Sequence, residues 1–312
     1  MYKCRFRHVV ISGILSKNLR RALKMKKLVS ENVIINGNRI AHGVHGEGKP
    51  LVLIHGTPFF SHIWRKVLPP LVAAGYRVHV YDLLGFGYSE RPRDPSIDTS
   101  VSAQLPVLLE LMSHWKLENS HIVAHDIGGA IAQQLGIYHS ERIKSLTIID
   151  TVSFDSWPSK RTREQMAAGL ENLIGARDET HREHFSEWIN SAAYDQDNLH
   201  SGPHAAYLEM ISGPVGQASL FQHQIMHYDP EHTLKVVERL HELGNLPIQF
   251  IWGANDQWQV VDWAHKLHAA VPGSSLHILE ECGHLVPEDQ PEQLLELVMK
   301  HVENSDNSYA HE

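Results

Sequence analysis

Three side chains with catalytic chemistry follow one another along the chain in the order carboxylate, carboxylate, imidazole. They are Asp126, Asp256 and His284. Each stands just after a short apolar run, and such runs predict strands buried on both faces of a parallel sheet. Because the carboxyl ends of parallel strands meet at one sheet edge, we expect the three side chains to converge there. Asp126 is then a candidate nucleophile, His284 a candidate base, and Asp256 the acid that orients the histidine.

The stretch around Asp126 predicts a sharp turn. Residues 124–129 read AHDIGG and follow the pattern small-x-nucleophile-x-glycine. Small residues let a strand and a helix meet tightly, which pushes the central side chain into a cleft. A carboxylate there can attack a saturated carbon and form a covalent ester. The pattern is also compatible with a simpler role, in which Asp126 caps the N-terminus of the following helix.

Backbone N–H groups near this turn are candidates for an oxyanion hole. The segment HGTP at 55–58 follows the apolar run 51–54. In this setting the N–H of Thr57 can point at the Asp126 carboxyl, beside the N–H of Ile127. An ordinary strand-to-loop turn is the plainer interpretation of the same residues.

Two more residues compete for roles in the predicted site. Asp150 ends another apolar run and is an alternative to Asp256 as the acid. Cys282 lies on the loop of His284, two residues before it, and not at the turn that carries the candidate nucleophile. We therefore expect Cys282 to be a structural thiol.

The order of apolar runs predicts a doubly wound, mostly parallel α/β sheet. Segment 33–41 is typical of a hairpin around an Asn-Gly turn. Helix-length segments such as 101–115 and 262–270 lie between strand-length runs. The expected buried strands are 51–54, 78–81, 122–124, 146–149, 248–252 and 276–279.

The strand rhythm breaks between residues 151 and 245, a polar segment rich in histidine and aromatic residues. We expect 29–150 and 246–304 to form the core and 151–245 a helical cap over the sheet edge.

From about residue 31 to residue 302 the chain resembles the α/β-hydrolase superfamily. The motifs that carry the resemblance are HGTP (55–58), DLLGFGYSERP (82–92), AHDIGG (124–129), WGANDQW (252–258) and CGHLVPEDQP (282–291). The run HGTPFFSHIWRKVLPPL especially resembles haloalkane dehalogenases, and an HGxP segment is also usual in epoxide hydrolases. Both families use an aspartate nucleophile.

This resemblance implies a two-step reaction. Asp126 attacks a saturated carbon and becomes an alkyl ester, which water activated by His284 then hydrolyses. Asp256 orients the histidine and stabilises its positive charge. A small, largely apolar substrate is implied, with no cofactor and no metal.

The chain departs from both families at the residues that hold the leaving group. Dehalogenases usually carry a tryptophan after the nucleophile, where this chain has Ile127, and many carry an asparagine where it has Thr57. Trp157 and Trp188 are the cap residues that can compensate. Epoxide hydrolases use two cap tyrosines, for which Tyr194, Tyr207 and Tyr228 are the candidates.

Haloalkane dehalogenase-like chemistry is the first expectation from these comparisons and epoxide hydrolysis the alternative. Two readings without an aspartyl ester stay open. One is a non-catalytic protein on this fold. The other is an enzyme that acts by proton abstraction, with His284 as the base.

Composition limits the wider setting of this chain. Its 312 residues carry a net charge of −8, which argues against a nucleic-acid surface. Residues 1–27 hold nine Lys or Arg and no acid, so we expect 1–28 to be a basic N-terminal extension. No apolar run approaches the ~20 residues of a membrane span. The polar end, 305–312, is expected to be a disordered tail.

The remaining residues of interest predict neither a metal site nor a bound dinucleotide. The two cysteines lie far apart, so a reducing, cytoplasmic setting is expected. The 24 histidines include two pairs that would face one way on a helix, His223 with His227 and His181 with His184, but no thiol or carboxylate set joins them at recognised metal-ligand spacing. Residues 85–87 lack the third glycine of a dinucleotide-binding fingerprint. The oligomeric state is left open.

Overall fold

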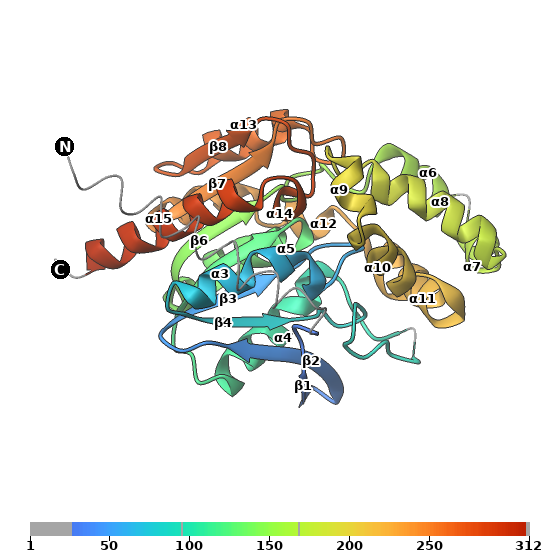
Figure 1. Cartoon of the computed structure of the whole chain (residues 1–312), viewed down its shortest axis with the longest axis horizontal. Coiled ribbons are helices and arrows are strands. Elements are labelled where there is room, and N and C mark those ends of the chain that lie inside the picture. The colour runs from blue at the N-terminus through green and yellow to red at the C-terminus, as the bar shows by residue number, and fades with distance from the viewer. Residues whose placement is uncertain (1–26, 95, 168, 310–312) are drawn as a thin grey trace.

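The computed structural model describes residues 27–94, 96–167 and 169–309, and within them eight strands form one sheet (Figure 1). The sheet order is β1-β2-β4-β3-β5-β6-β7-β8. The first two strands pair antiparallel and all later neighbours pair parallel, which confirms the expected α/β-hydrolase fold. The strands are β1 (Glu31–Ile35), β2 (Asn38–His45), β3 (Lys49–Ile54), β4 (Tyr76–Tyr81), β5 (Ser120–His125), β6 (Ile143–Ile149), β7 (Ile248–Gly253) and β8 (Ser275–Leu279).

Every apolar run expected to be a strand is one. The central strands β5 and β7 are buried along their whole length, which explains why their sequences do not alternate. Asn36 and Gly37 have φ of 49° and 82°, as the expected hairpin turn requires. The helices that flank the sheet are η1 (Ser61–Lys66), α3 (Leu68–Ala73), α4 (Val101–His114), α5 (Ile127–Tyr138), η2 (Ser140–Arg142), α13 (Val261–Ala270), α14 (Val286–Asp289) and α15 (Pro291–Tyr309).

Between β6 and β7 the described residues form helices and no strand. Most of these helices lie together at one end of the sheet, which is the position expected for a cap (Figure 1). The last of them, η5, packs instead on the core helix α5, so the end of segment 151–245 belongs with the core. The helices are α6 (Lys160–Ala167), α7 (Glu171–Ile174), α8 (Asp178–Asn190), α9 (Gln196–His200), α10 (Pro203–Met210), α11 (Gly213–Ser219), η3 (Leu220–Gln224), η4 (Ile225–His227), α12 (Glu231–Leu234) and η5 (Val237–Asn245).

The C-terminal segment differs from its expectation. Helix α15 runs through Tyr309, so a disordered tail from residue 305 is wrong for residues 305–309. The reason is tertiary: Asp306 pairs with Lys49 at 2.5 Å and with His121 at 3.3 Å, which ties the last turn to the core. Residues 310–312 and 1–26, and with them most of the basic extension, lie outside the described residues.

No helix among the described residues combines the length and the apolar character that a bilayer span needs.

Candidate functional site

Asp126 occupies a strained turn between β5 and α5. Its φ of 56° and ψ of −123° lie where side chains other than glycine are rarely found. The turn closes only because its neighbours are small. A Cβ on Gly56 would lie 2.3 Å from the Asp126 Cβ, and one on Gly128 would lie 2.6 Å from the His55 carbonyl oxygen. The glycines of HGTP and AHDIGG therefore place the Asp126 carboxyl at the carboxyl edge of the sheet.

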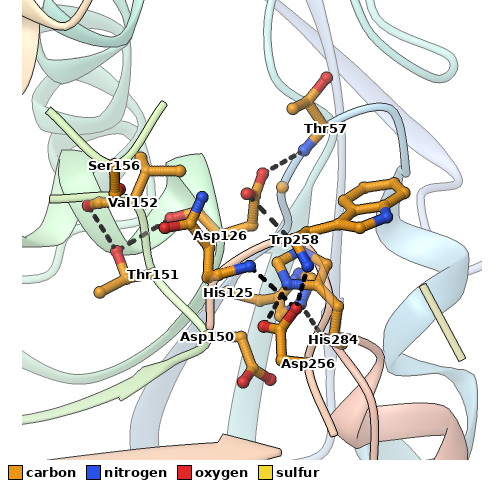
Figure 2. Close-up of polar contacts among 12 residues, drawn as sticks. Thr57, His125, Asp126, Asp150, Thr151, Val152, Ser156, Asp256, Trp258 and His284 are labelled. Carbon is orange, nitrogen blue, oxygen red and sulfur yellow. Dashed lines mark hydrogen bonds and ion pairs between the residues drawn. The ribbon is translucent and has the colours of Figure 1, made fainter. Parts of the chain in front are cut away.

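The Asp126 carboxyl is held from one side only. The Thr57 backbone N–H donates to Oδ1 at 2.7 Å, whereas Oδ2 lies 3.6 Å from Nε2 of His284 (Figure 2). The side chain makes no capping hydrogen bond to α5, which contradicts the helix-cap interpretation. Burial alone would raise the pKa of Asp126. The closeness and charge of His284, the charge of His125 and the Ile127 N–H outweigh burial and lower this pKa below its ordinary value.

His284 and Asp256 form the rest of the expected constellation. Nδ1 of His284 lies 2.8 Å from Oδ2 of Asp256 (Figure 2). The other oxygen, Oδ1, accepts the backbone N–H groups of Trp258 at 2.7 Å and Gln259 at 2.9 Å. These bonds fix the plane of the carboxylate, which in turn fixes the imidazole. Nε2 of His284 is left without a hydrogen bond and faces Asp126.

The electrostatics of His284 follow from the two carboxylates around it. Burial would lower its pKa, but the charge and hydrogen bond of Asp256 and the nearby charge of Asp126 raise it well above the ordinary histidine value. His125 lies beneath, with its ring 4.7 Å from that of His284, and Nε2 of His125 donates to the His284 carbonyl at 2.8 Å. Burial first, and then the His284 charge, lower the pKa of His125 to about 3. His125 is therefore a neutral support beside a readily protonated imidazole.

The two competing residues have other surroundings. Asp150 follows β6, is fully buried, and accepts the Gly253 N–H at 2.9 Å. It makes no hydrogen bond to His284, so Asp256 is the acid that contacts the imidazole. Cys282 is buried, and burial raises the pKa of its thiol, which leaves it a poor nucleophile.

A cavity of about 230 Å³ opens above Asp126. Its floor is made by Thr57, Asp126 and Ile127, and its walls come from the cap and from the loop after β7. The wall is mixed: about half of its side chains are apolar or aromatic, and polar groups come from the cap and from the loop after β7. The wall residues are Val152, Trp157, Pro158, Ser159, Thr162, Gln165, His184, Phe185, Trp188, Ser191, Ile225, Tyr228, Gln257, Trp258 and Gln259.

The candidate aromatic residues of the cap differ in whether they line the cavity. Trp157, Trp188 and Tyr228 line the cavity. Tyr207 and Tyr194 do not, so their assignment to the site is wrong. The Tyr207 hydroxyl donates to the buried carboxylate of Glu288, and Tyr194 is 48% exposed beside a separate polar cleft.

Sequence reasoning missed the tryptophan that packs against the histidine. The Trp258 ring lies 4.9 Å from the rings of both His284 and Trp188. It forms a wall between the imidazole and the cap. Its place two residues after Asp256, inside the WGANDQW motif, was the available signal.

The indole N–H and phenol O–H groups of these aromatic residues are the hydrogen-bond donors that a leaving group could use. The indole N–H of Trp157 donates to Thr233 at 2.9 Å, and that of Trp258 donates to Ser191 at 2.9 Å. The Tyr228 hydroxyl hydrogen-bonds to Oγ1 of Thr57, the residue whose N–H holds Asp126. Tyr228 thus brings an O–H group to the floor of the cavity.

Within 27–94, 96–167 and 169–309, no three His, Cys, Asp or Glu side chains are grouped so that they could hold a metal ion.

Comparisons with known proteins agree with this architecture. An uncharacterised protein of Mycobacterium tuberculosis is 26% identical over 93% of this chain and 86% of its own. The cis-3-alkyl-4-alkyloxetan-2-one decarboxylase of Shewanella oneidensis is 24% identical over 83% of this chain and 84% of its own. A crystal structure of an alpha/beta hydrolase fold protein from Burkholderia ambifaria superposes with a TM-score of 0.78 and 29% identity, over 88% of this chain and 98% of that one. Residues 49–291 match the alpha/beta hydrolase fold family, and the chain belongs to it.

Proposed function

We propose that this chain hydrolyses a small, largely apolar electrophile through a covalent ester on Asp126. The observation that carries the proposal is the unequal treatment of the two carboxylate oxygens. Oδ1 is held by the Thr57 N–H, whereas Oδ2 faces His284 across 3.6 Å at the cavity floor. In the first step Oδ2 attacks the electrophilic carbon, and the bond to the leaving atom breaks with its electron pair.

The second step hydrolyses the ester. Once Asp126 is esterified its charge is gone, and with it one of the influences that raise the pKa of His284. The histidine can then act as a base, take a proton from water and direct the hydroxide at Cγ of Asp126. The negative charge that forms on Oδ1 is stabilised by the N–H groups of Thr57 and Ile127. As the intermediate collapses, His284 returns the proton to the departing oxygen, the product leaves as an alcohol, and the aspartate is restored.

The geometry supports ring-oxygen opening, the alternative of the two expected reactions, better than halide release. A halide needs N–H donors. The indoles of Trp157 and Trp258 already donate to protein oxygens, which leaves Trp188 as the remaining candidate among the tryptophans that line the cavity. A ring oxygen needs a proton donor. The Tyr228 hydroxyl lines the cavity, and to serve it has to exchange its hydrogen bond to Oγ1 of Thr57, which itself donates to Gln224, for one to the ring oxygen. The relative from Shewanella oneidensis, whose name specifies an oxetan-2-one, indicates that a strained oxygen ring suits this family.

The cap and the core have different roles in the proposed function. Segment 151–230, with its helices and loops, supplies most of the cavity wall, so we place substrate selection there and the chemistry in the core. The free, buried Cys282 fits a reducing cytoplasm.

A substrate panel tests the proposed reaction. Purified protein is incubated separately with epoxides, β-lactones and chloro- or bromoalkanes of matched chain length, and diol, hydroxy acid or alkene, and free halide are measured. We expect turnover of a strained oxygen ring, and Asp126→Asn is the inactive control. Halide release without ring opening would overturn the ring-oxygen assignment while keeping the aspartyl ester. Activity retained in Asp126→Asn would overturn the nucleophile.

A further inference from the structure

Two buried carboxyl groups lie side by side behind the imidazole. Asp150 follows β6 and Asp256 follows β7, and Figure 2 shows the two carboxyls close together beneath His284. Their exposed fractions are 0% and 5%. Two negative charges so near each other in a buried site repel strongly. Such a pair of carboxyl groups commonly keeps one proton.

The hydrogen bonds show which of the two is the carboxylate. Asp256 receives three donors, from His284 and from the backbone N–H groups of Trp258 and Gln259. Asp150 receives one, the Gly253 N–H on Oδ1, and no donor from the described residues reaches its Oδ2. A buried, ionised oxygen without a donor is costly. A proton on Oδ2 removes that cost and gives Asp150 a donor of its own beside Asp256.

The backbone of Asp150 is held in place. Its own N–H donates to the Ile251 carbonyl at 3.1 Å, and its φ is 41°. Aspartate and asparagine tolerate that region better than other side chains with a Cβ. The side chain is thus held between two strand ends, with no path to water.

We propose that Asp150 is a positioning residue that stays neutral, donates a hydrogen bond to Asp256 and keeps Asp256 the one negative charge behind His284. Its role in turnover rests on the proposed function, because it acts through the base of the second step. Burial, followed by the charge of Asp256, agrees with this by raising the pKa of Asp150 well above its ordinary value.

The titratable groups around Asp150 and Asp256 determine how the pKa of His284 changes when the hydrogen bond from Asp150 is lost. Those facing Asp150 are Asp256, His284 and the neutral thiol of Cys282. On the far side, His284 meets Asp126, and neutral His125 lies beneath it. A hydrogen bond from Asp150 spreads the charge of Asp256 and weakens its hold on the imidazole proton. Without that bond His284 keeps its proton to higher pH, and ester hydrolysis begins at higher pH.

Two variants separate a neutral Asp150 from a charged one. Asp150→Asn keeps the shape, tolerates the positive φ and can still donate to Asp256. Asp150→Gly removes the carboxyl and is free of backbone strain. We expect the acid limb of the turnover profile to stay within a few tenths of a pH unit in Asp150→Asn and to rise by about one unit in Asp150→Gly. A lower acid limb in Asp150→Asn would mean that Asp150 is ionised, and an unshifted limb in Asp150→Gly would mean that it does not act on His284. Either result overturns the proposal.

An infrared measurement tests the protonation state without substrate, so it stands whether or not Asp126 is the nucleophile. The difference spectrum between the unmodified protein and Asp150→Asn at neutral pH should contain the C=O stretch of a carboxylic acid. Replacing the exposed Asp155 by asparagine is the matched control and should show only a carboxylate difference. A carboxylate band for Asp150 would overturn the inference and leave the proposed reaction untouched.

Discussion

Nε2 of His284 lies 3.6 Å from Oδ2 of Asp126, and no hydrogen bond from the described residues satisfies that nitrogen. The separation is slightly too long for a direct hydrogen bond. It places the base next to the carboxyl carbon, where an ester of Asp126 has to be attacked. The relationship explains why a carboxylate at this turn is compatible with a histidine-dependent hydrolase.

The first prediction is that replacing His284 separates the two steps. Asp126 attacks as a carboxylate that its neighbours already keep ionised, so ester formation needs no base. Hydrolysis does need one. His284→Phe should therefore react once and stall, with substrate-derived mass on the peptide that contains Asp126. Mass spectrometry after digestion checks this, with Asp126→Asn/His284→Phe as the control that cannot form the adduct. An active substrate that leaves no adduct on His284→Phe contradicts the aspartyl ester.

The second prediction concerns the pH at which each step stops. The pKa of Asp126 is lowered, so alkylation should persist as the pH falls. The pKa of His284 is raised, and only neutral imidazole is a base, so hydrolysis should fail first on acidification. Rapid-quench experiments should therefore show more accumulated ester at pH 5 than at pH 8. Equal ester levels across that range would indicate that His284 is not the base.

The sequence predicted the parts of this site that stand at strand ends. Asp126 and His284 follow apolar runs, and a parallel sheet brings such positions to one edge whatever else the chain does. The sheet itself was predictable for the same reason, since each buried strand is a continuous local run. Asp256 could be preferred to Asp150 from sequence, but only the structure shows which one contacts the imidazole.

The cap could not be predicted to the same depth. Nothing in the spacing of Tyr207 and Tyr228 distinguishes them, yet one is bonded to Glu288 and the other faces Thr57. That difference depends on how the cap helices pack on the core, which has no rule comparable to the strand ends. Trp258 was overlooked because its contact with Trp188 joins segments that are distant in the sequence.

The third prediction assigns proton donation to Tyr228. If its hydroxyl protonates the opening ring oxygen, Tyr228→Phe should slow ester formation by about 10²-fold, the low end of general acid catalysis. The rate of ester hydrolysis should change less, because that step uses His284. Single-turnover kinetics separates the two rates. Tyr194→Phe is the matched control, since Tyr194 lies outside the cavity and is exposed. Equal rates in both variants would remove Tyr228 from the chemistry.

The last prediction concerns acid stability and depends on a residue far from the site. His79 in β4 is fully buried, and neither ring nitrogen has a hydrogen-bond partner among the described residues. Burial, aided by the charges of Arg77, His42 and His45, lowers its pKa to about 4, whereas an unfolded histidine titrates near 6.5.

Because the folded pKa of His79 is the lower one, the unfolded chain binds the proton first on acidification. The stabilisation is complete above about pH 6.5 and is lost as the pH falls towards 4, at a cost of roughly 3 kcal/mol for this one group. His79→Phe should flatten that part of the stability curve, measured as the free energy of unfolding in urea at several pH values. The exposed His241→Phe variant should leave the slope unchanged. If His79→Phe keeps the full pH dependence, other buried histidines must account for the acid sensitivity.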